Sequence, residues 1–364
     1  MCALGPALSD EQMPGDDELG GLGVAHLARM LARAASARSG PTGPLWSRYD
    51  MECDRILLDG LGLGLEPTMA RMWQSAPSLD EFECWVLDQK GGELDAARVR
   101  RINALILGEP YDQATVDALA AIDARPPVLD DDDLRDWQES GYVVVQNAVD
   151  IDVCRAAERT VWEYLAASPD EPASWYSSRL NGIMVQLFQH PTLEAVRRSP
   201  RIHKAFAQLW ETADLLGTTD RCGFNPPERD GWQFPGPLLH LDVALQPPVP
   251  FGTQGIVYLT PTSPDQGAFS CVPGFHRRID QWLVDSHSQR DRDAQVKALA
   301  ALPIPGGPGD LVIWHQALPH GASPNRDALP RIVQYIAMAP PFPSLHRRYD
   351  ETAEFVEQSS SEDR

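Results

Sequence analysis

The sequence predicts a mainly β fold with helical additions: a β-sandwich or jelly roll in the second half of the chain, and a helical domain before it. Three observations predict this fold class. Apolar residues recur at helical spacing from Val24 to Ala124. A Pro-Pro pair at 126–127 interrupts the chain. From about residue 215, short β-branched and aromatic runs alternate with Pro- and Gly-rich turns, which is typical of antiparallel strands.

The chain of 364 residues is long enough for two domains. We expect a mobile N-terminus over 1–22, a helical domain over 23–126, a β-rich domain over 127–345 and an acidic tail over 346–364. The first segment mixes Gly, Pro, Asp and Glu, and the last ends in EQSSSEDR. Both compositions are typical of segments that bury too little apolar surface to fold.

Helix signals fill the first domain. Leu27, Met30 and Leu31 follow helical spacing in VAHLARMLARAAS. Ser78 and Glu81 form a capping box ahead of FECWVLDQ, which predicts that a helix begins there. Two further helical patterns follow in ELDAARVRRINALI and TVDALAAID.

The second domain is expected to begin with mixed elements. LDDDDLRDWQESG predicts a short helix whose first aspartates face the positive end of the helix dipole, with a cation site as the alternative. A strand is expected at 142–149, and helices at 151–167 and 192–212. The expected strands of the β-rich part are LLGTTDRCGF, LLHLDVAL, GIVYLT, GAFSCVP, DLVIWH and RIVQYIAMA, with DSHSQRDRDAQVKALAAL as a helical insertion.

The composition limits the kinds of partner and the cellular location expected for the protein. A net charge of −21 disfavours nucleic acid and anionic membrane surfaces, because both carry the same sign. The six cysteines include no Cys-x-x-Cys pair, which favours reduced thiols and a cytoplasmic protein. The N-terminal residues have no signal-peptide pattern, and no apolar run approaches the roughly 20 residues that span a bilayer. We expect a small-molecule substrate, and a homodimer through the helical domain is one assembly left open.

Three residues carry the strongest chemical signal. His240 and Asp242 stand as His-Leu-Asp, and residues two apart in an extended strand project from the same face. His320 follows in LPHGASPN. Two imidazoles and one carboxylate form the ligand set of a non-haem Fe(II) site with open coordination positions. We therefore predict that this triad binds iron, and that Arg331 binds the far carboxylate of a keto acid. A hydrogen-bonded strand pair is the alternative for His-x-Asp alone.

The arrangement resembles the phytanoyl-CoA dioxygenase family of iron(II)- and 2-oxoglutarate-dependent oxygenases over about residues 130–345. The matching segments are LDDDDLRDWQESGYVVVQNAVD, the His-x-Asp pair, DQGAFSCVPGFHRR, GDLVIWHQALPHGASPN and PRIVQYIA. The resemblance implies a double-stranded β-helix (a cupin-like jelly roll), Fe(II) as cofactor, and 2-oxoglutarate and O2 as cosubstrates. It also implies the three iron ligands and the role of Arg331 given above. Asp242 argues against halogenation, because halogenases of the family have a small residue there.

One departure from the family concerns the cosubstrate. The family often has Ser or Thr two residues after the distal histidine, where this chain has Ala322 with Ser323 next. The second cosubstrate contact is therefore left open, with Ser323, Gln254 and Tyr258 as candidates. Packing is an equal alternative for Gln254 and Tyr258. Three residues are candidates for substrate binding: Arg221, for which a salt bridge is the alternative, Asn181 and Gln186.

The expected function is a dioxygenase that hydroxylates a small metabolite, in a biosynthetic setting, with release of succinate and CO2. Desaturation, epimerisation and cyclisation use the same chemistry, and the sequence does not choose among them. A metal-binding β-sandwich that acts as a sensor or pseudo-enzyme is the alternative from another class. A metal-dependent hydrolase is disfavoured, because no motif supplies a general base beside a metal-bound water.

Overall fold

The computed structural model describes residues 13–39, 47–236, 238–243, 246–286 and 288–346. The chain divides into two compact units. One holds the residues up to Ala124 together with Leu216–Thr219, and the other holds Arg125–Leu215 and the residues from Asp220 onward. Most of the predicted mobile N-terminus (1–12) and almost all of the predicted acidic tail (347–364) lie outside the described residues. No helix within the described ranges is long and apolar enough to cross a membrane.

The first unit consists of helices and one short strand. Their bounds are α1 Leu27–Ser39, α2 Arg48–Leu61, α3 Leu65–Ser75, α4 Leu79–Gln89, α5 Ala96–Leu107, α6 Gln113–Asp123 and β4 Leu216–Gly217. The capping box predicted at Ser78 and Glu81 is present at the start of α4. A second capping box, at Ser47 and Asp50, begins α2.

Residues 13–22, which the sequence predicts to be mobile, instead make specific contacts within the first unit. The Leu22 backbone N–H donates to Glu83 Oε1 over 3.1 Å. The buried His26 ring lies between two carboxylates, with Nδ1 2.6 Å from Asp16 Oδ1 and Nε2 2.9 Å from Asp54 Oδ1. The His26 ring therefore links Asp16 of this segment to Asp54 of α2.

The second unit contains both helices and strands. Its helices are α7 Asp131–Ser140, α8 Ile151–Leu165, α9 Pro191–Arg197, α10 Pro200–Trp210, α11 Ile279–Asp285 and α12 Gln289–Lys297, with short 3-10 turns at Pro172–Trp175, Phe275–Arg278 and Pro343–Leu345. Asp130 and Asp133 form a capping box at the start of α7, so these aspartates act as helix-start residues. The single helix expected at 192–212 is divided in two, because Pro200 cannot continue α9.

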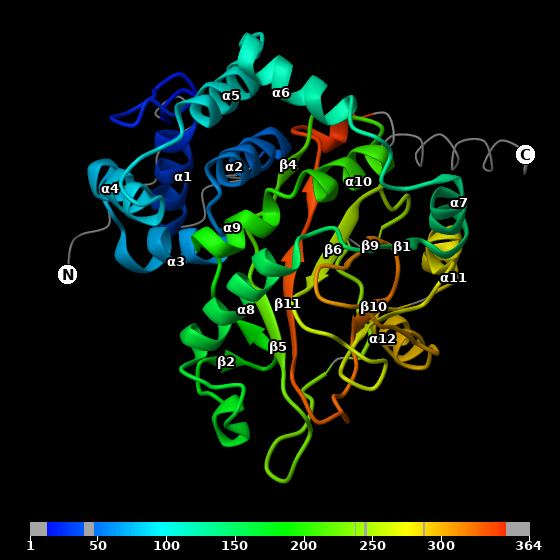
Figure 1. Cartoon of the computed structure of the whole chain (residues 1–364). Helices are drawn as coiled ribbons and strands as arrows, with labels where there is room; N and C mark the ends of the chain where they lie inside the picture. The colour runs from blue at the N-terminus through cyan, green and yellow to red at the C-terminus, as the bar shows by residue number, and fades with distance from the viewer. Residues whose placement is uncertain (1–12, 40–46, 237, 244–245, 287, 347–364) are drawn as a thin grey trace, which may run out of the picture. The chain divides into compact units, whose positions relative to one another are not determined.

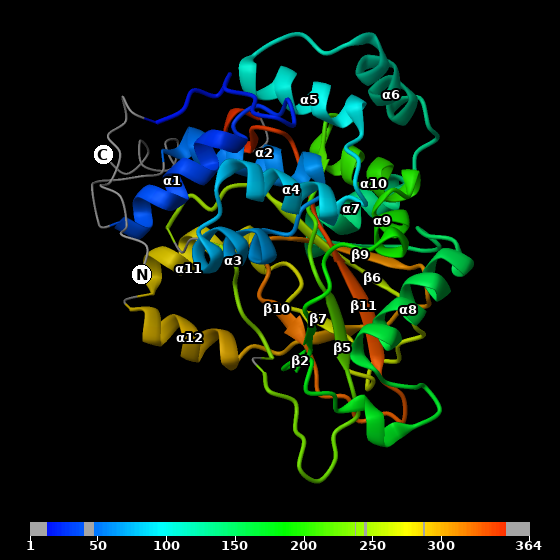
Figure 2. The same ribbon diagram turned by 90° about the vertical axis from the view of Figure 1, so that its left-hand side faces the viewer.

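Two antiparallel sheets carry the strands that position the site. The larger has the order β1-β9-β6-β11-β5-β3-β2, and the smaller has the order β10-β7-β8. Figure 2 shows β9, β6, β11 and β5 side by side. The bounds are β1 Tyr142–Val145, β2 Leu180–Asn181, β3 Met184–Val185, β5 Cys222–Asn225, β6 Thr253–Tyr258, β7 Phe269–Cys271, β8 Leu302–Ile304, β9 Leu311–His315, β10 His320–Ala322 and β11 Arg331–Ile336, followed by β12 Met338–Ala339.

A shared apolar core holds the two sheets. It includes Ile256 of β6, Val312 of β9 and Val333 of β11 from the larger sheet, and Phe269 and Cys271 of β7 from the smaller one. Each of these side chains is at most 3% exposed. The strands that carry site residues are therefore fixed by buried packing rather than by surface contacts. Figure 1 shows β6, β9 and β10 in the same part of this unit, with α11 and α12 beside them.

The structure corrects the prediction of a strand at LLHLDVAL. Its described residues form no regular strand, and only an isolated antiparallel bridge joins His240 to His320. The two backbone bonds of that bridge measure 2.9 and 3.0 Å. Prolines flank the segment on both sides, among them Pro235 and Pro247, and a proline lacks the N–H that a strand ladder requires.

Candidate active site

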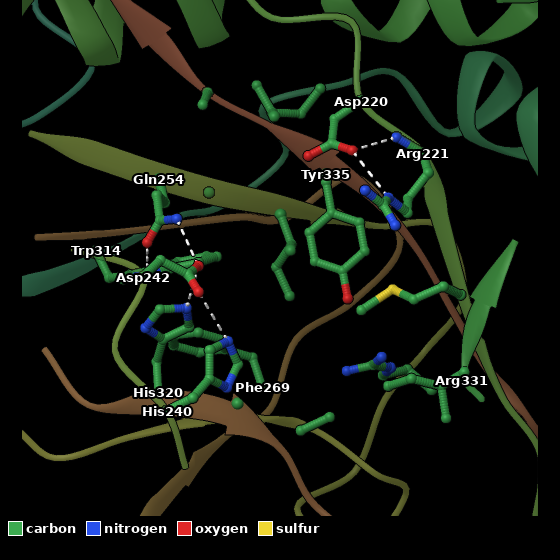
Figure 3. A pocket seen from close by; sticks show the side chains of 18 of the residues that line it. Asp220, Arg221, His240, Asp242, Gln254, Phe269, Trp314, His320, Arg331 and Tyr335 are labelled. Carbon is green, nitrogen blue, oxygen red and sulfur yellow. Dashed lines mark hydrogen bonds and ion pairs between the residues drawn. The ribbon is translucent and has the colours of Figure 1, made fainter. Parts of the chain in front are cut away.

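The three residues predicted to bind metal lie together (Figure 3). One ligand atom from each of His240, Asp242 and His320 lies within 4.8 Å of the others. Asp242 Oδ1 is 3.4 Å from His240 Nε2, and Asp242 Oδ2 is 3.4 Å from His320 Nε2. Leu241, between the first two, packs against the apolar core instead. The backbone bridge thus brings together residues that are eighty positions apart.

The hydrogen bonds of His320 orient its ring. Its Nδ1 lies 2.9 Å from the Leu318 carbonyl oxygen, which can only accept, so Nδ1 carries the proton and donates. Nε2 is then the ring nitrogen that faces Asp242. A ligand histidine held in this way by a backbone carbonyl is the usual arrangement in metal sites. His240 presents its Nε2 to the same carboxylate, and its buried Nδ1 has no hydrogen-bond partner among the described residues.

The protonation states of these side chains also suit a divalent metal. The His320 imidazole holds the pKa of Asp242 well below its ordinary value, and the Gln254 amide adds to this effect. Burial lowers the pKa of His240, with a further contribution from His320. At neutral pH Asp242 is therefore ionised and His240 neutral, as metal coordination requires. Two imidazoles and a carboxylate with an open side fit Fe(II).

Gln254 contacts Asp242 rather than a cosubstrate position. Its Nε2 donates to Asp242 Oδ2 over 2.9 Å. Its Oε1 accepts a bond from Trp314 Nε1 over 3.0 Å. Gln254 also lines the pocket, but both ends of its amide are used within the protein. The structure shows a contact with the carboxylate of the triad, and the prediction that Gln254 binds the cosubstrate stays a prediction.

A pocket of about 330 Å³ opens onto the triad. Among the described residues, its charged lining apart from the triad consists of Asp220, Arg221 and Arg331. Most of the remaining lining is apolar and comes from Ile183, Met184, Phe234, Ile256, Phe269, Trp314, Ala322, Ile336 and Ala337, with the ring of Tyr335 among them.

Arg331 lies at the start of β11 and is 2% exposed. Its Nε and Nη2 have no hydrogen-bond partner in the part of the chain that the structure describes. Leaving two guanidinium nitrogens buried without partners is costly, so an anion is favoured at this end of the pocket. Arg331 and Tyr335 share one face of β11, because side chains alternate along a strand.

A glycine on the neighbouring strand makes room for this arrangement. Gly223 of β5 is paired with Val333 of β11. A Cβ atom at Gly223 would lie 3.4 Å from Arg331 Nη2, 3.5 Å from Tyr335 Cε2 and 2.9 Å from Val333 Cγ2. The side chains of Arg331 and Tyr335 therefore lie over Gly223, and a residue with a side chain would press on both.

Tyr335 is a pocket residue that the sequence predictions missed. Burial raises the pKa of its hydroxyl, although the neighbouring Arg331 acts in the opposite direction. The hydroxyl therefore keeps its proton at neutral pH and is a donor beside the guanidinium. Strand alternation from Arg331 is the signal that could have found it.

Two predicted cosubstrate residues do not line the pocket. The Tyr258 hydroxyl donates to the Ile304 carbonyl oxygen and accepts from the Phe269 N–H, and the side chain is fully buried. The Ser323 hydroxyl donates to the Ala268 carbonyl oxygen over 3.3 Å. Both are packing residues here, whereas the preceding Ala322 lines the pocket.

The three predicted substrate residues have different positions. Arg221 lines the pocket and pairs with Asp220, so the salt bridge is present and substrate binding stays a prediction. Asn181 is exposed on β2 and does not line the pocket. Gln186 is also absent from the lining, where Ile183 and Met184 from the same hairpin take the place expected for polar residues.

Comparison with known proteins finds a matching family. The model of a family described as phytanoyl-CoA dioxygenase matches residues 137–333, more than half of the chain. A protein of Dictyostelium discoideum that bears this family's name is 20% identical over 257 residues, covering 56% of this chain and 74% of its own length.

Two further relatives come from biosynthetic systems. Ava biosynthesis cluster protein O of Aspergillus versicolor is 24% identical over 163 residues, which are 40% of this chain and 53% of that protein, so the match spans about half of it. Among solved structures, the non-heme alpha ketoglutarate dependent carbocyclase SnoK from nogalamycin biosynthesis is 19% identical, with 59% of this chain and 88% of SnoK covered and a TM-score of 0.43.

Proposed function

Because the chain belongs to the phytanoyl-CoA dioxygenase family and is thus a non-haem Fe(II)- and 2-oxoglutarate-dependent oxygenase, we propose that it hydroxylates a small metabolite. The observation that carries the proposal is one pocket with two features. The ligand atoms of His240, Asp242 and His320 converge within 4.8 Å at one side of it. The buried guanidinium of Arg331, whose Nε and Nη2 have no hydrogen-bond partner among the described residues, lies at another.

The three converging side chains would hold Fe(II). When bound, Fe(II) and 2-oxoglutarate supply oxygen activation, with one oxygen atom passing to succinate and the other to the substrate. The role of the protein is geometric. His240, Asp242 and His320 would hold the metal from one side and would leave the pocket side for the keto acid, dioxygen and the substrate. The Trp314 ring, 5.0 Å from the ring of His320, keeps that ligand in apolar surroundings.

Arg331 and Tyr335 would together bind the far carboxylate of 2-oxoglutarate. A guanidinium pairs with a carboxylate through two parallel hydrogen bonds, and Nε and Nη2 of Arg331 have no competing partner within the described chain. The Tyr335 hydroxyl offers a third donor from the same strand face. The family often has a Ser or Thr at the position of Ala322, which has no hydroxyl. The Tyr335 hydroxyl would replace that missing donor.

The size of the pocket favours a small substrate. Its volume of about 330 Å³ is at the lower end of the roughly 300–1,000 Å³ of small-molecule sites, and 2-oxoglutarate occupies part of it. Which of the possible reactions occurs depends on the substrate carbon that lies nearest the open face of the triad. Hydroxylation is the proposal, and desaturation, epimerisation and cyclisation are distinguished from it by the mass and structure of the product.

The test uses the purified full chain with Fe(II), 2-oxoglutarate and a metabolite extract. We expect succinate release and a product that gains one oxygen atom, both followed by mass spectrometry. His240→Ala and His320→Ala should lose Fe(II) binding and turnover, whereas His190→Ala, at the exposed start of α9, should retain both. A wild-type chain that binds neither Fe(II) nor 2-oxoglutarate would contradict the assignment. Binding of both without turnover of any metabolite would favour a sensor.

A further inference from the structure

Two opposite charges in the pocket are left over once the metal and the cosubstrate are assigned. Asp220 and Arg221 line the pocket from the residues that lead into β5. Figure 3 shows both above the Tyr335 ring, on the opposite side of that ring from Arg331. The other charged groups of the described lining belong to the triad or to Arg331. The pair therefore has no role in the proposed binding of metal and cosubstrate.

The backbone and side chains of this pair are held in place. Asp220 Oδ1 accepts bonds from the Arg221 backbone N–H over 2.7 Å and from Arg221 Nε over 3.2 Å. The Asp220 carbonyl oxygen accepts from Arg197 Nη2 over 2.8 Å. The Arg221 guanidinium carbon lies 5.5 Å from the centre of the Phe188 ring. Groups fixed in this way lose little conformational entropy when a ligand binds.

Both side chains are still open to the pocket. The Asp220 side chain is 44% exposed and that of Arg221 is 25% exposed. A ligand that fills the pocket removes water from both. If that ligand were apolar, the lost hydration of the two charges would not be replaced, and binding would be penalised. The substrate must therefore present its own polar groups at this position.

The charge balance of the loaded site indicates which groups these are. The charges of Fe(II), Asp242, doubly ionised 2-oxoglutarate and Arg331 cancel, and so do those of Asp220 and Arg221. A substrate with a net charge would leave that charge unbalanced in a largely apolar pocket. A molecule that carries one positive and one negative group satisfies both the local pair and the overall balance.

We propose that the substrate is a small zwitterion whose ammonium group binds Asp220 and whose carboxylate binds Arg221. This inference rests on the proposed function, because it assigns Arg331 to the cosubstrate. Ile183, Met184 and Phe234 line the pocket and would contact the apolar part of such a molecule. That part then lies between the charged pair and the triad, where a C–H bond is to be attacked.

The first test compares the binding of matched ligands under anaerobic conditions. The probes are L-amino acids with apolar side chains, each set beside its N-acetyl derivative and its primary amide. Binding to the chain loaded with Fe(II) and 2-oxoglutarate is measured by calorimetry. At least one zwitterion should bind, and removing either charge should weaken its binding about tenfold or more, as expected for a hydrogen bond to a charged group.

The second test changes the protein. Asp220→Asn keeps the shape of the side chain and removes its charge, and Arg221→Met keeps an unbranched stem beside Phe188. Each variant should weaken binding of the zwitterion about tenfold or more. Asp220→Asn should also lose the discrimination against the N-acetyl derivative. Asp170→Asn, at an exposed position outside the pocket lining, should behave like the wild type.

Two results would overturn the inference: no zwitterion of the panel binds while 2-oxoglutarate binding is intact, or a probe with one charge or none binds as well as its zwitterionic parent. Unchanged affinity in both variants would also overturn it. Loss of 2-oxoglutarate binding by the wild type would instead count against the proposed function. The ligand comparison needs no variant, so it stands even if Asp220→Asn or Arg221→Met fails to fold.

Discussion

Gln254 donates a hydrogen bond from Nε2 to Asp242 Oδ2 over 2.9 Å. The direction of this bond is fixed from the other end of the amide, because the indole N–H of Trp314 can only donate and therefore faces Gln254 Oε1. Trp314 is 3% exposed and belongs to β9. Asp242 lies in a segment without regular strand structure, so this chain of contacts orients its carboxylate from the core of the sheet.

The Gln254 contact predicts an effect on metal affinity. Gln254→Ala should weaken Fe(II) binding by about 10–100-fold, the usual cost of removing a group that orients a metal ligand. Trp314→Phe removes the indole N–H and keeps an aromatic ring beside Phe269, so its effect should be smaller and in the same direction. Anaerobic metal titration measures both. Wild-type affinity in Gln254→Ala would show that Asp242 needs no such support.

Tyr335→Phe should weaken binding of 2-oxoglutarate and spare Fe(II). The lost hydroxyl is a donor to a charged carboxylate, so a decrease of about tenfold is expected. Calorimetry with 2-oxopentanoate, which has a methyl group in place of the far carboxylate, is the matched comparison. The variant and the wild type should bind that keto acid equally. An equal loss for both keto acids would mean that Tyr335 acts on packing and not on the carboxylate.

Gly223→Ala should weaken 2-oxoglutarate binding through its effect on Arg331 and not through direct contact with the metal. The added Cβ would lie 2.9 Å from Val333 Cγ2 and 3.4 Å from Arg331 Nη2, so Val333 and the guanidinium must shift. Gly307→Ala is a suitable control, because its Cβ would meet only Asp310 Oδ2 at 3.5 Å among the described neighbours. A cosubstrate titration in which both variants equal the wild type would argue against the position assigned to Arg331.

The sequence could predict that the triad residues come together because each of the two motifs that carry them is local, and their role as metal ligands stays a prediction. Alternation pairs His240 with Asp242 even where the chain forms only a bridge, and His320 follows in a motif with its own turn residues. Helix starts such as Ser78 with Glu81 were predictable for the same reason. In each case a few neighbouring residues determine the outcome.

The cosubstrate residues were harder to predict because they depend on how far along a strand the pocket extends. Gln254 and Tyr258 share one face of β6, but they are four residues and thus about 13 Å apart, and only Gln254 lines the pocket. Ser323 is one position out of step with His320 and Ala322, so it turns away to Ala268. Tyr335 is in step with Arg331 and faces the site. A sequence motif gives the spacing of residues along the chain, but it does not show how far a cavity extends along a strand.

The last prediction concerns acid stability and depends on His315, a histidine outside the triad. Its ring packs against Phe251, with ring centres 5.4 Å apart, and lies 5.2 Å from the ring of His276. Burial lowers the pKa of His315 to about 3, and His276 adds to the shift. The unfolded chain has the ordinary pKa of about 6.5 at this residue. As the pH falls from 6.5 toward 3, the unfolded state gains a proton that the folded state does not, so stability is lost across this range.

His315→Asn should make the loss of stability with falling pH shallower, because an amide does not titrate. The amide oxygen can still accept the Ala317 N–H that His315 Nδ1 accepts over 3.1 Å. The variant should be less stable than the wild type near neutral pH, since it loses the packing of the ring, and the difference should narrow toward about pH 5. Urea unfolding at both pH values measures this. Parallel pH profiles for His315→Asn and the wild type would show that His315 does not titrate with the shift described.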